Sequence, residues 1–400
     1  MAAAIPDVRD DAKAMQDDLV ELRRRLHREP EVGLQNPRTQ EKVLDAISGL
    51  PLEVSTGTET SSVTGVLRGG KPGPTVLLRG DMDALPVIEN LDVDFRSTNE
   101  SMHACGHDLH TSMLVGAATL LSARRDSLAG DVVFMFQPGE EGYDGAGVMI
   151  KEGILAASGQ HPIAAYALHV TSAVLPAGLF ASRPGTIMAA ADKLIVTVRG
   201  AGGHGSAPHR ALDPIPAACE MVSALQTFVT RSFDVFDPVV LTVGMFHSGT
   251  AHNVIPDEAT FEATIRSFSE SAHARVLDES VRVVRGIAAA HGLEVEVSPQ
   301  ALFPVTVNEQ ANVDVVTDRV RNLYGENRWF ELPFPLTGSE DFSRILQAVP
   351  GAMVFLGALP IGASPDTAPF NHSPLAAFDD AVLSDGAGLY ADLALTHLAG

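Results

Sequence analysis

The chain has 400 residues, with 28 basic and 50 acidic side chains and a net charge of −22. This excess of acid argues against a nucleic-acid-binding protein, because phosphates are neutralised by clustered lysine and arginine. The length favours two domains, and the two cysteines, Cys105 and Cys219, indicate no disulfide framework. With no signal-peptide pattern and no run of about 18 apolar residues, a cytoplasmic protein without a membrane partner is expected.

Strand and helix patterns alternate along the first half of the chain. Continuous apolar runs such as DVVFMFQ are typical of strands buried on both faces of a sheet. Apolar residues at spacings of three and four predict helices between these runs. The pattern predicts an α/β fold with mostly parallel strands. The expected strands are 75–81, 131–137 and 164–170, and the expected helices are 7–29, 37–50 and 109–121.

The pattern changes near residue 184, where strands begin to alternate apolar and polar side chains. Four such strands and two long helices predict an α+β unit with a largely antiparallel sheet. The α/β pattern resumes after about residue 301. The simplest organisation is a catalytic domain at 1–183 and 301–400, with an inserted domain at 184–300. The later elements are strands 193–200, 239–246, 259–268, 293–298 and 352–357, and helices 214–231, 271–291, 313–324 and 376–398.

Acidic and histidine side chains lie at three predicted strand ends. RGDMDALP contributes Asp81 and Asp83, QPGEEGYDGA contributes Glu140 and Glu141, and ALHV contributes His169. In an open α/β sheet, ligands bind beyond the carboxyl ends of the strands. Each segment alone has an ordinary explanation: the carboxylates could be solvated loop residues, and a lone histidine is more often part of a core than a ligand.

The stretch MHACGHDLH, residues 102–110, combines Cys105 and His107 in a C-x-H arrangement. Three interpretations are open from this stretch alone: a metal site, a thiol nucleophile with a histidine base, or a buried thiol among capping polar residues. Together with the strand-end acids, a di-metal hydrolase centre accounts for most of these residues, because it needs several ligands and one free carboxylate as base. His372, in NHSP, carries no signal by itself.

The motifs in order resemble the amidohydrolase branch of the di-metal aminoacylase and carboxypeptidase superfamily. That branch includes hippurate hydrolases, indoleacetyl-amino-acid hydrolases and N-acyl-L-amino-acid amidohydrolases. The resemblance spans nearly the whole chain. It rests on the stretches RGDMDALP, MHACGHDLH, QPGEEG, LHV, GGHGSAPH, HNVIPDEA and GSEDF.

The resemblance implies two divalent ions per subunit, of zinc, manganese, cobalt or nickel, with Cys105 as the bridging ligand. It implies that Glu140 is the general base and acid and that Asp83 orients a ligand. Asp81 stands where more distant relatives have a histidine ligand, and His107 is expected to supply that imidazole. The implied metal ligands are Cys105, His107, Glu141, His169 and His372.

For the inserted domain, the resemblance implies a ferredoxin-like dimerisation lid and a homodimer or a dimer of dimers. His204 would reach the partner subunit's active site and hydrogen-bond the developing oxyanion. Asn253 would hold the scissile carbonyl or the substrate carboxylate, and Arg266 would clamp the carboxylate. The alternative for Arg266 is a solvent-facing strand residue. Gly338, in GSEDF, is expected at the substrate-binding site.

The expected reaction is hydrolysis of the amide bond of a small N-acyl amino acid, hippurate-like or indoleacetyl-amino-acid-like, by a metal-bridged water. One alternative is a related dipeptidase or deacetylase of aminobenzoyl-glutamate or N-acetyl-diaminopimelate type. Others are a metal-binding protein without activity, which the presence of Glu140 disfavours, and a cysteine-nucleophile hydrolase. The loop FRSTNESMHACGHD departs from the usual pattern of the family, which leaves the acyl preference open.

Overall fold

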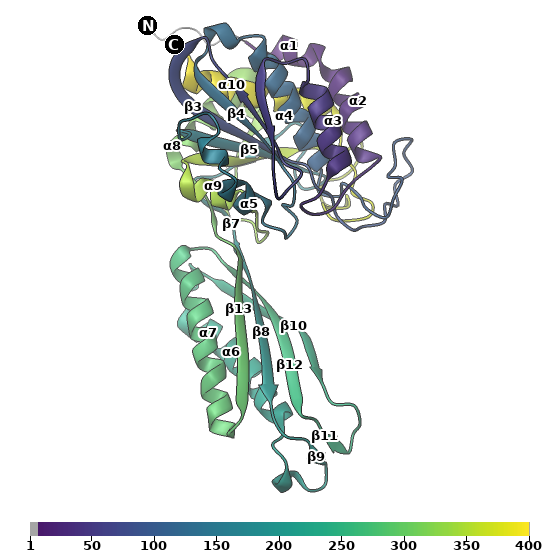
Figure 1. The fold of residues 1–400 in the computed structure, drawn as a ribbon, viewed down its shortest axis with the longest axis vertical. Helices are drawn as coiled ribbons and strands as arrows, with labels where there is room; N and C mark the ends of the chain where they lie inside the picture. Colours follow the sequence, from purple (N-terminus) through teal and green to yellow (C-terminus); the bar gives the residue numbers. More distant parts are fainter. Residues whose placement is uncertain (1–6, 400) are drawn as a thin grey trace. The chain divides into compact units, whose positions relative to one another are not determined.

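The computed structural model describes residues 7–399, which fold into two compact units (Figure 1). The larger unit comprises the described residues up to Ile187, Val307–Phe334 and the residues from Arg344 onward. The smaller unit comprises Met188–Thr306 and Pro335–Ser343. Each unit has its own cluster of buried apolar side chains.

The larger unit contains an eight-stranded sheet in the order β1-β2-β4-β3-β5-β16-β6-β15. Neighbouring strands from β4 to β16 are parallel, as are β6 and β15, and the remaining pairs are antiparallel. The predicted α/β fold with a mostly parallel central sheet is confirmed. The strands are β1 (Leu52–Thr56), β2 (Val63–Leu67), β3 (Lys71–Asp81), β4 (Ala129–Gln137), β5 (Ala164–Thr171), β6 (Phe180–Ser182), β15 (Trp329–Glu331) and β16 (Gly351–Gly357).

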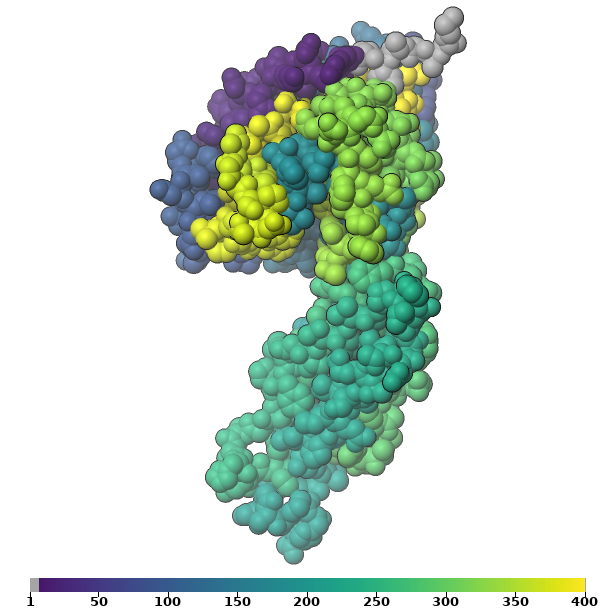
Figure 2. Space-filling view, turned by 180° about the vertical axis from the view of Figure 1, so that it is seen from behind, coloured from purple at the N-terminus to yellow at the C-terminus, as the bar shows by residue number. Residues whose placement is uncertain are grey.

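Two helices, α4 and α10, pack against each other and against the central strands β3, β4 and β5. Helices α1 and α2 lie over this pair, so α4 is buried along its whole length except at Thr119. Figure 2 shows that the surface of the larger unit combines residues from early (purple and blue) and late (yellow and green) parts of the chain. The helices are α1 (Arg9–Ala14), α2 (Gln16–His27), α3 (Pro37–Ile47), α4 (His107–Ser122), α5 (Gly145–Lys151), α8 (Gln310–Tyr324), α9 (Ser343–Ala348) and α10 (Leu383–Leu398).

Two predicted helices differ most in extent from the helices of the structure. The single helix expected at 7–29 is two helices, because the chain turns at Met15 and the Gln16 side chain then bonds the backbone of residues 380 and 384. The helix expected at 376–398 begins only at Leu383. Asp379 has an extended backbone, its N–H donates to the carbonyl oxygen of Ala358, and its carboxylate caps a short 3-10 turn before α10.

The smaller unit has a four-stranded antiparallel sheet in the order β10-β12-β8-β13, with helices α6 and α7 on one face. Alternate side chains such as Val196 and Phe261 are fully buried against these helices, while their neighbours lie on the open face. The predicted α+β unit is confirmed. Its elements are β8 (Ala190–Arg199), α6 (Pro214–Ser232), β10 (Val239–Ser248), β12 (Glu258–Ser267), α7 (Glu270–His291) and β13 (Glu294–Phe303).

Two small sheets complete the fold. Strand β9 (Gly203–His204) pairs with β11 (Val254–Ile255) in the smaller unit. Strand β7 (Gly185–Met188) pairs with β14 (Thr306–Asn308); these are two of the stretches where the chain passes from one unit to the other. Among the described helices, none combines the length and the apolar character that a membrane crossing requires.

Candidate metal centre

The carboxyl ends of three neighbouring strands carry the predicted site residues. Asp81 is the last residue of β3 and lies opposite Gln137, the last residue of β4. His169 lies near the end of β5, the other parallel neighbour of β3. Because parallel strands end at one edge of a sheet, the segments after Asp81 and Gln137 and the side chain of His169 are brought together.

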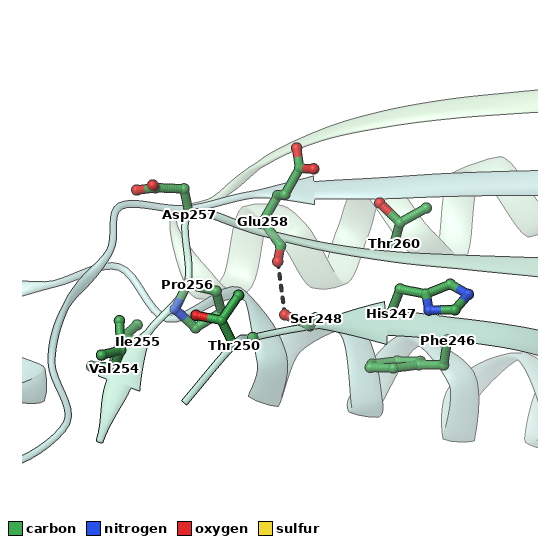
Figure 3. A pocket seen from close by; sticks show the side chains of 11 residues that line it. Phe246, His247, Ser248, Thr250, Val254, Ile255, Pro256, Asp257, Glu258 and Thr260 are labelled. Atoms are coloured by element: carbon green, nitrogen blue, oxygen red, sulfur yellow. Dashed lines mark hydrogen bonds between the residues drawn. The ribbon is translucent and has the colours of Figure 1, made fainter. Parts of the chain in front are cut away.

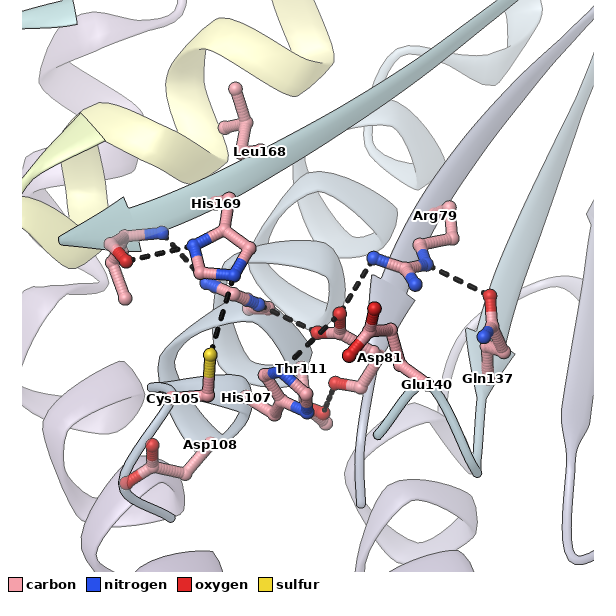
Figure 4. Close-up of polar contacts among 12 residues, drawn as sticks. Arg79, Asp81, Cys105, His107, Asp108, Thr111, Gln137, Glu140, Leu168 and His169 are labelled. Carbon is pink, nitrogen blue, oxygen red and sulfur yellow. Dashed lines mark hydrogen bonds and ion pairs between the residues drawn. The ribbon is translucent and has the colours of Figure 1, made fainter. Parts of the chain in front are cut away.

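Because Gly106 has no side chain, the Cys105 loop can lie close to the end of β5. Gly106 has φ 86°, and a Cβ there would lie 2.3 Å from Cγ2 of Val170. Helix α4 therefore begins at His107, two residues earlier than predicted, and carries His107 in its first turn. The Sγ atom of Cys105 lies 3.4 Å from Nε2 of His169 (Figure 4).

His372 and Glu141 approach the same sulfur from other segments. Nε2 of His372 is 3.3 Å from Sγ of Cys105 and 3.2 Å from Oε1 of Glu141. His372 has φ 72°, which is uncommon for residues other than glycine, and its backbone N–H donates to the carbonyl oxygen of Ala104. All five predicted metal ligands thus lie together in the larger unit.

Three sets of donor atoms drawn from the predicted ligands and Glu140 lie close enough to hold ions, with all atoms of each set within 4.8 Å of one another. Several of these atoms have ionic neighbours but no hydrogen bond: among the described residues, both ring nitrogens of His107 and Oε1 of Glu141 are buried without one. Thiolate, imidazole and carboxylate together suit zinc and related transition metals. The residues fit a metal centre. The sets are Cys105, His107 and His169; Cys105, Glu141 and His372; and His107, Glu140 and Glu141.

Asp83 fixes the backbone that carries the two glutamates. Its Oδ1 accepts the N–H of Glu140 and its Oδ2 accepts the N–H of Glu141, both at 3.1 Å. Oδ1 also lies 3.4 Å from Nδ1 of His107. Asp83 is fully buried, and burial raises the pKa of its carboxyl group. It therefore holds Glu140, Glu141 and His107 in one arrangement.

The protonation of the site follows from burial and neighbouring charge. Burial raises the pKa of the Cys105 thiol to about 12, with Glu141 adding to the effect. Burial also lowers the pKa of His169 well below its usual value, which leaves a neutral imidazole. For Glu141, burial opposes ionisation, but His372 and His107 lower its pKa. The surroundings thus disfavour a free thiolate nucleophile at Cys105, keep the His169 imidazole neutral and favour an ionised Glu141.

Both oxygens of Asp81 are bonded, as those of Asp83 are, but the partners of Asp81 are side chains rather than backbone N–H groups. Arg79 Nη1 donates to Oδ2 at 2.6 Å (Figure 4). Nδ1 of His110 lies 2.6 Å from Oδ1. Burial opposes the charge on Asp81, but Arg79 and the histidines hold its pKa well below the usual range. Nε2 of His107, a candidate metal ligand, lies 3.6 Å from Oδ2 of Asp81.

The remaining predicted residues belong to the smaller unit. Nδ1 of His204 accepts the N–H and hydroxyl of Ser206, and the carbonyl oxygen of Asn253 accepts the N–H of Gly205. Arg266 Nη1 donates to Thr264 Oγ1 and to the carbonyl oxygen of Ile265, and burial lowers its pKa. The carbonyl oxygen of Gly338 accepts the N–H of Ala189 at 3.0 Å.

His204 and Arg266 lie at opposite ends of the sheet of the smaller unit. His204 follows the end of β8, where Arg199 pairs with Glu258, whereas Arg266 pairs with Ala191 near the start of β8. Eight residues separate Glu258 from Arg266 along β12. At about 3.3 Å per residue, that is roughly 26 Å. One small substrate cannot contact both side chains of the same chain.

Two residues of this region were not assigned from the sequence. His110 lies in the stretch MHACGHDLH, three residues after His107 on α4. This spacing places both histidines on one face of the helix, which was the available sequence signal that His110 lies near the site. Asn371 precedes His372; its Nδ2 donates to the carbonyl oxygens of Cys105 and Val170. Nothing in the sequence pattern marks Asn371, because both partners are remote along the chain.

A separate cavity of about 750 Å³ lies in the smaller unit, where β10 ends and β12 begins (Figure 3). Ser248 and Glu258 lie on its wall, and Ser248 Oγ donates to the carbonyl oxygen of Glu258 at 2.7 Å. None of the candidate metal ligands lines this cavity. Its size alone therefore does not identify it as the catalytic site.

Residues 77–396 match peptidase family M20/M25/M40. The chain belongs to this family. It is therefore a hydrolase of the metal-dependent class, which agrees with the cluster of candidate ligands. The resemblance to the amidohydrolase branch, read from the motifs, is confirmed.

The M20-family chain is similar to curated proteins over nearly its full length. It is 38% identical to thermostable carboxypeptidase 2 of Saccharolobus solfataricus over 98% of each chain. It is 35% identical to an IAA-amino acid hydrolase of Arabidopsis thaliana, over 96% of this chain and 86% of that one. It is 32% identical to a hippurate hydrolase of Campylobacter jejuni, over 98% and 99% of the two chains.

Solved structures show the same fold. A protein of methicillin-resistant Staphylococcus aureus described as an aminohydrolase has a TM-score of 0.92 and 29% identity, covering 99% of this chain and 100% of that chain. A dinuclear metal binding peptidase of the family from Bacillus subtilis has a TM-score of 0.81 and 30% identity, covering 96% and 99%.

Proposed function

We propose that this M20-family protein hydrolyses the amide bond of N-acyl amino acids with the help of two divalent metal ions. Cys105, His107, Glu141, His169 and His372 are the proposed ligands, and Glu140 is the proposed general base and acid. The observation that carries the proposal is the convergence of five sulfur, nitrogen and oxygen donors from four segments, with the buried Glu140 directly beside one of them.

Glu140 is suited to proton transfer because its backbone is fixed by Asp83 while the metal-ligand role falls to its neighbour Glu141. Divalent ions at this centre would lower the pKa of a water molecule and polarise the amide carbonyl. Glu140 takes the proton of the attacking water and then gives it to the departing amine, which leaves as the free amino acid. Cys105 serves as a ligand in this scheme rather than as a nucleophile.

The substrate class follows from the relatives and from the proposed carboxylate clamp. Carboxypeptidases and hydrolases of amino-acid conjugates cut the same kind of bond, an amide whose nitrogen belongs to an amino acid. The half-buried guanidinium of Arg266 would bind the carboxylate of that amino acid. Asn253 and Gly338 would bind the rest of the amide, and a cytoplasmic location is part of the proposal.

We propose that the site is completed in a homodimer or a dimer of dimers through the smaller unit. The separation of about 26 Å between the ends of its sheet supports this arrangement, because His204 and Arg266 of one chain cannot serve one small substrate. His204 of a second copy would then stabilise the developing oxyanion. The larger unit would be the catalytic domain and the smaller unit its lid.

A substrate panel tests the proposal. Metal-free protein is reconstituted separately with zinc, manganese, cobalt and nickel and assayed on hippurate, acetyl-amino acids and indoleacetyl-amino acids. We expect hydrolysis that a chelator abolishes and added metal restores, without a covalent acyl-enzyme. Activity that survives complete metal removal would overturn the proposal.

The second candidate is a peptidase, because a carboxypeptidase is 38% identical over 98% of the chain. The same panel therefore includes N-blocked peptides, dipeptides, aminobenzoyl-glutamate and N-acetyl-diaminopimelate. Ratios of kcat/KM that favour a peptide over every acyl amino acid would assign the protein to that candidate. The metal centre and Glu140 would keep their roles.

A further inference from the structure

His110 uses both of its ring nitrogens although it belongs to none of the proposed ligand sets. Its Nδ1 is 2.6 Å from Oδ1 of Asp81, and its Nε2 is 2.7 Å from the backbone nitrogen of Val170. A backbone N–H can only donate, so Nε2 accepts and the proton lies on Nδ1, facing Asp81. His110 is fully buried, and burial lowers its pKa, which agrees with this neutral form.

This hydrogen bonding leaves His110 no lone pair for a metal ion. Asp81, His107 and His110 lie close enough together to be considered as a ligand set. However, Asp81 is held by Arg79 and His110, and Nε2 of His110 is taken by Val170. Asp81 and His110 are therefore a hydrogen-bonded support behind the metal centre, and they do not form a third metal site with His107.

The hydrogen bonds of Asp81 and His110 extend to Val170, the residue next to the proposed metal ligand His169. Val170 follows His169, and its carbonyl oxygen is 2.8 Å from Nδ1 of His169. Its N–H is bound by His110, whose ring centroid lies 4.8 Å from that of His169. Asn371 Nδ2 also donates to the Val170 carbonyl oxygen, at 3.0 Å. Val170 is thus held through its N–H by His110, and its carbonyl oxygen orients the imidazole of His169 toward Cys105.

We propose that His110 is a positioning residue that sets the location of His169 through the backbone of Val170. The chain of contacts runs from Arg79 through Asp81 and His110 to Val170, and so ties the ends of β3 and β5 to α4. The proposal rests on the metal centre described under Proposed function. It concerns metal binding directly and does not depend on which substrate is cut.

Two substitutions separate the two hydrogen bonds of His110. In His110→Asn, the amide can take the place of Nδ1 and keep the bond to Asp81, but it cannot reach Val170. In His110→Gln, the amide oxygen can take the place of Nε2 and accept the Val170 N–H. Tyr390→Phe is the matched control, because the Tyr390 hydroxyl accepts the N–H of Leu168, two residues earlier on the same strand, and donates to the backbone carbonyl oxygen of Arg79, so it bonds the ends of β5 and β3 without passing through His110.

Each protein is prepared without metal and titrated with cobalt. The thiolate absorption band of bound cobalt reports on Cys105, and its ligand-field bands report on the geometry of the site. Competition against a chelator gives the affinity for cobalt. We expect His110→Asn to weaken cobalt binding about 10–100-fold and to shift the bands. We expect His110→Gln to stay closer to the unsubstituted protein. Tyr390→Phe should lower the melting temperature without changing affinity or bands.

The cobalt affinities and absorption bands distinguish failure of this inference from failure of the proposed function. If the unsubstituted protein binds no cobalt, the metal centre itself is wrong. If it binds cobalt and His110→Asn binds equally well with unchanged bands, the positioning role is wrong. Equal weakening by Tyr390→Phe would also overturn it, since the effect would then reflect general loss of stability. His110→Phe, which removes both bonds, replaces the Asn variant if that protein does not fold.

Discussion

The carboxylate of Asp83 holds the backbone of Glu140, whose N–H donates to Oδ1 at 3.1 Å, while the second oxygen accepts the next N–H of the chain. One buried side chain therefore determines where both the proposed base and the adjacent ligand Glu141 lie. In Asp83→Asn, one oxygen is replaced by an NH₂ group that faces a backbone donor. We expect metal affinity to fall about 10–100-fold. Chelator competition measures this, and unchanged affinity would contradict the role of Asp83.

The two adjacent glutamates should respond differently to the same change. We expect Glu140→Gln to keep its metal and to lose at least about 10²-fold in turnover, because a proton-transfer group is removed. Glu141→Gln should instead lose metal. Metal analysis and kcat of both variants make the comparison. Near-normal turnover in Glu140→Gln, or loss of its metal, would contradict the assignment.

The two cysteines form a matched pair for testing the thiolate ligand. Cys105 is buried beside two histidines, whereas Cys219 is exposed. Cys105→Ser should sharply reduce metal content and abolish activity, because a hydroxyl is a poorer ligand than a thiolate. Cys219→Ser should change neither. Full metal content in Cys105→Ser, measured by elemental analysis after dialysis, would remove Cys105 from the ligand set.

Mixing two inactive variants tests whether His204 acts on a neighbouring subunit. If Glu140→Gln and His204→Ala subunits exchange, one site of each mixed dimer holds both intact residues. Up to roughly half of the activity of an unsubstituted dimer should then return, because stabilisation of the oxyanion is restored. Glu140→Gln mixed with Cys105→Ser is the control without rescue. No recovery despite demonstrated subunit exchange would mean that His204 does not act in trans.

His27 gives a prediction for the dependence of stability on pH. Its Nδ1 is 2.7 Å from Asp108 Oδ2 and its Nε2 is 3.1 Å from Glu89 Oε1. Burial opposes its charge, but Asp108 and Glu89 raise its pKa above the usual value. Such a group stabilises the fold below the unfolded pKa of about 6.5, and the contribution is lost as pH rises through the folded value.

His27→Gln should therefore lower the free energy of unfolding most below about pH 6.5, by about 3–5 kcal/mol, with a smaller difference at alkaline pH. Urea unfolding of metal-free protein at several pH values measures this. His397→Gln is the control with the opposite trend, since burial lowers the pKa of His397 and its neutral form is the stabilising one. A His27 difference that grows with rising pH would contradict the charged assignment.

The sequence determined the elements of the two units wherever local periodicity was strong. These elements include the apolar run of β4, the alternating strands of the smaller unit and helices α6 and α7. They were expected because the spacing of apolar side chains indicates whether one face or both faces of an element are buried. Prediction was weaker where the signal depended on distant partners. The break at Met15 goes with bonds from Gln16 to residues more than 350 positions away, and the late start of α10 goes with the bond from Asp379 to Ala358 on another segment.

The candidate ligands and Glu140 were named from the motifs, because residue type and order suffice to indicate a donor. The roles of similar side chains at the same edge were decided only by tertiary packing. Asp81 and Asp83 are two residues apart on one strand end, yet Asp81 is held by Arg79 and His110, while Asp83 binds the backbone of Glu140. The sequence indicates that both are acids at a strand end. Which atoms each one meets depends on contacts between β3, β5, α4 and the Glu140 loop, and those contacts form only when the chain is folded.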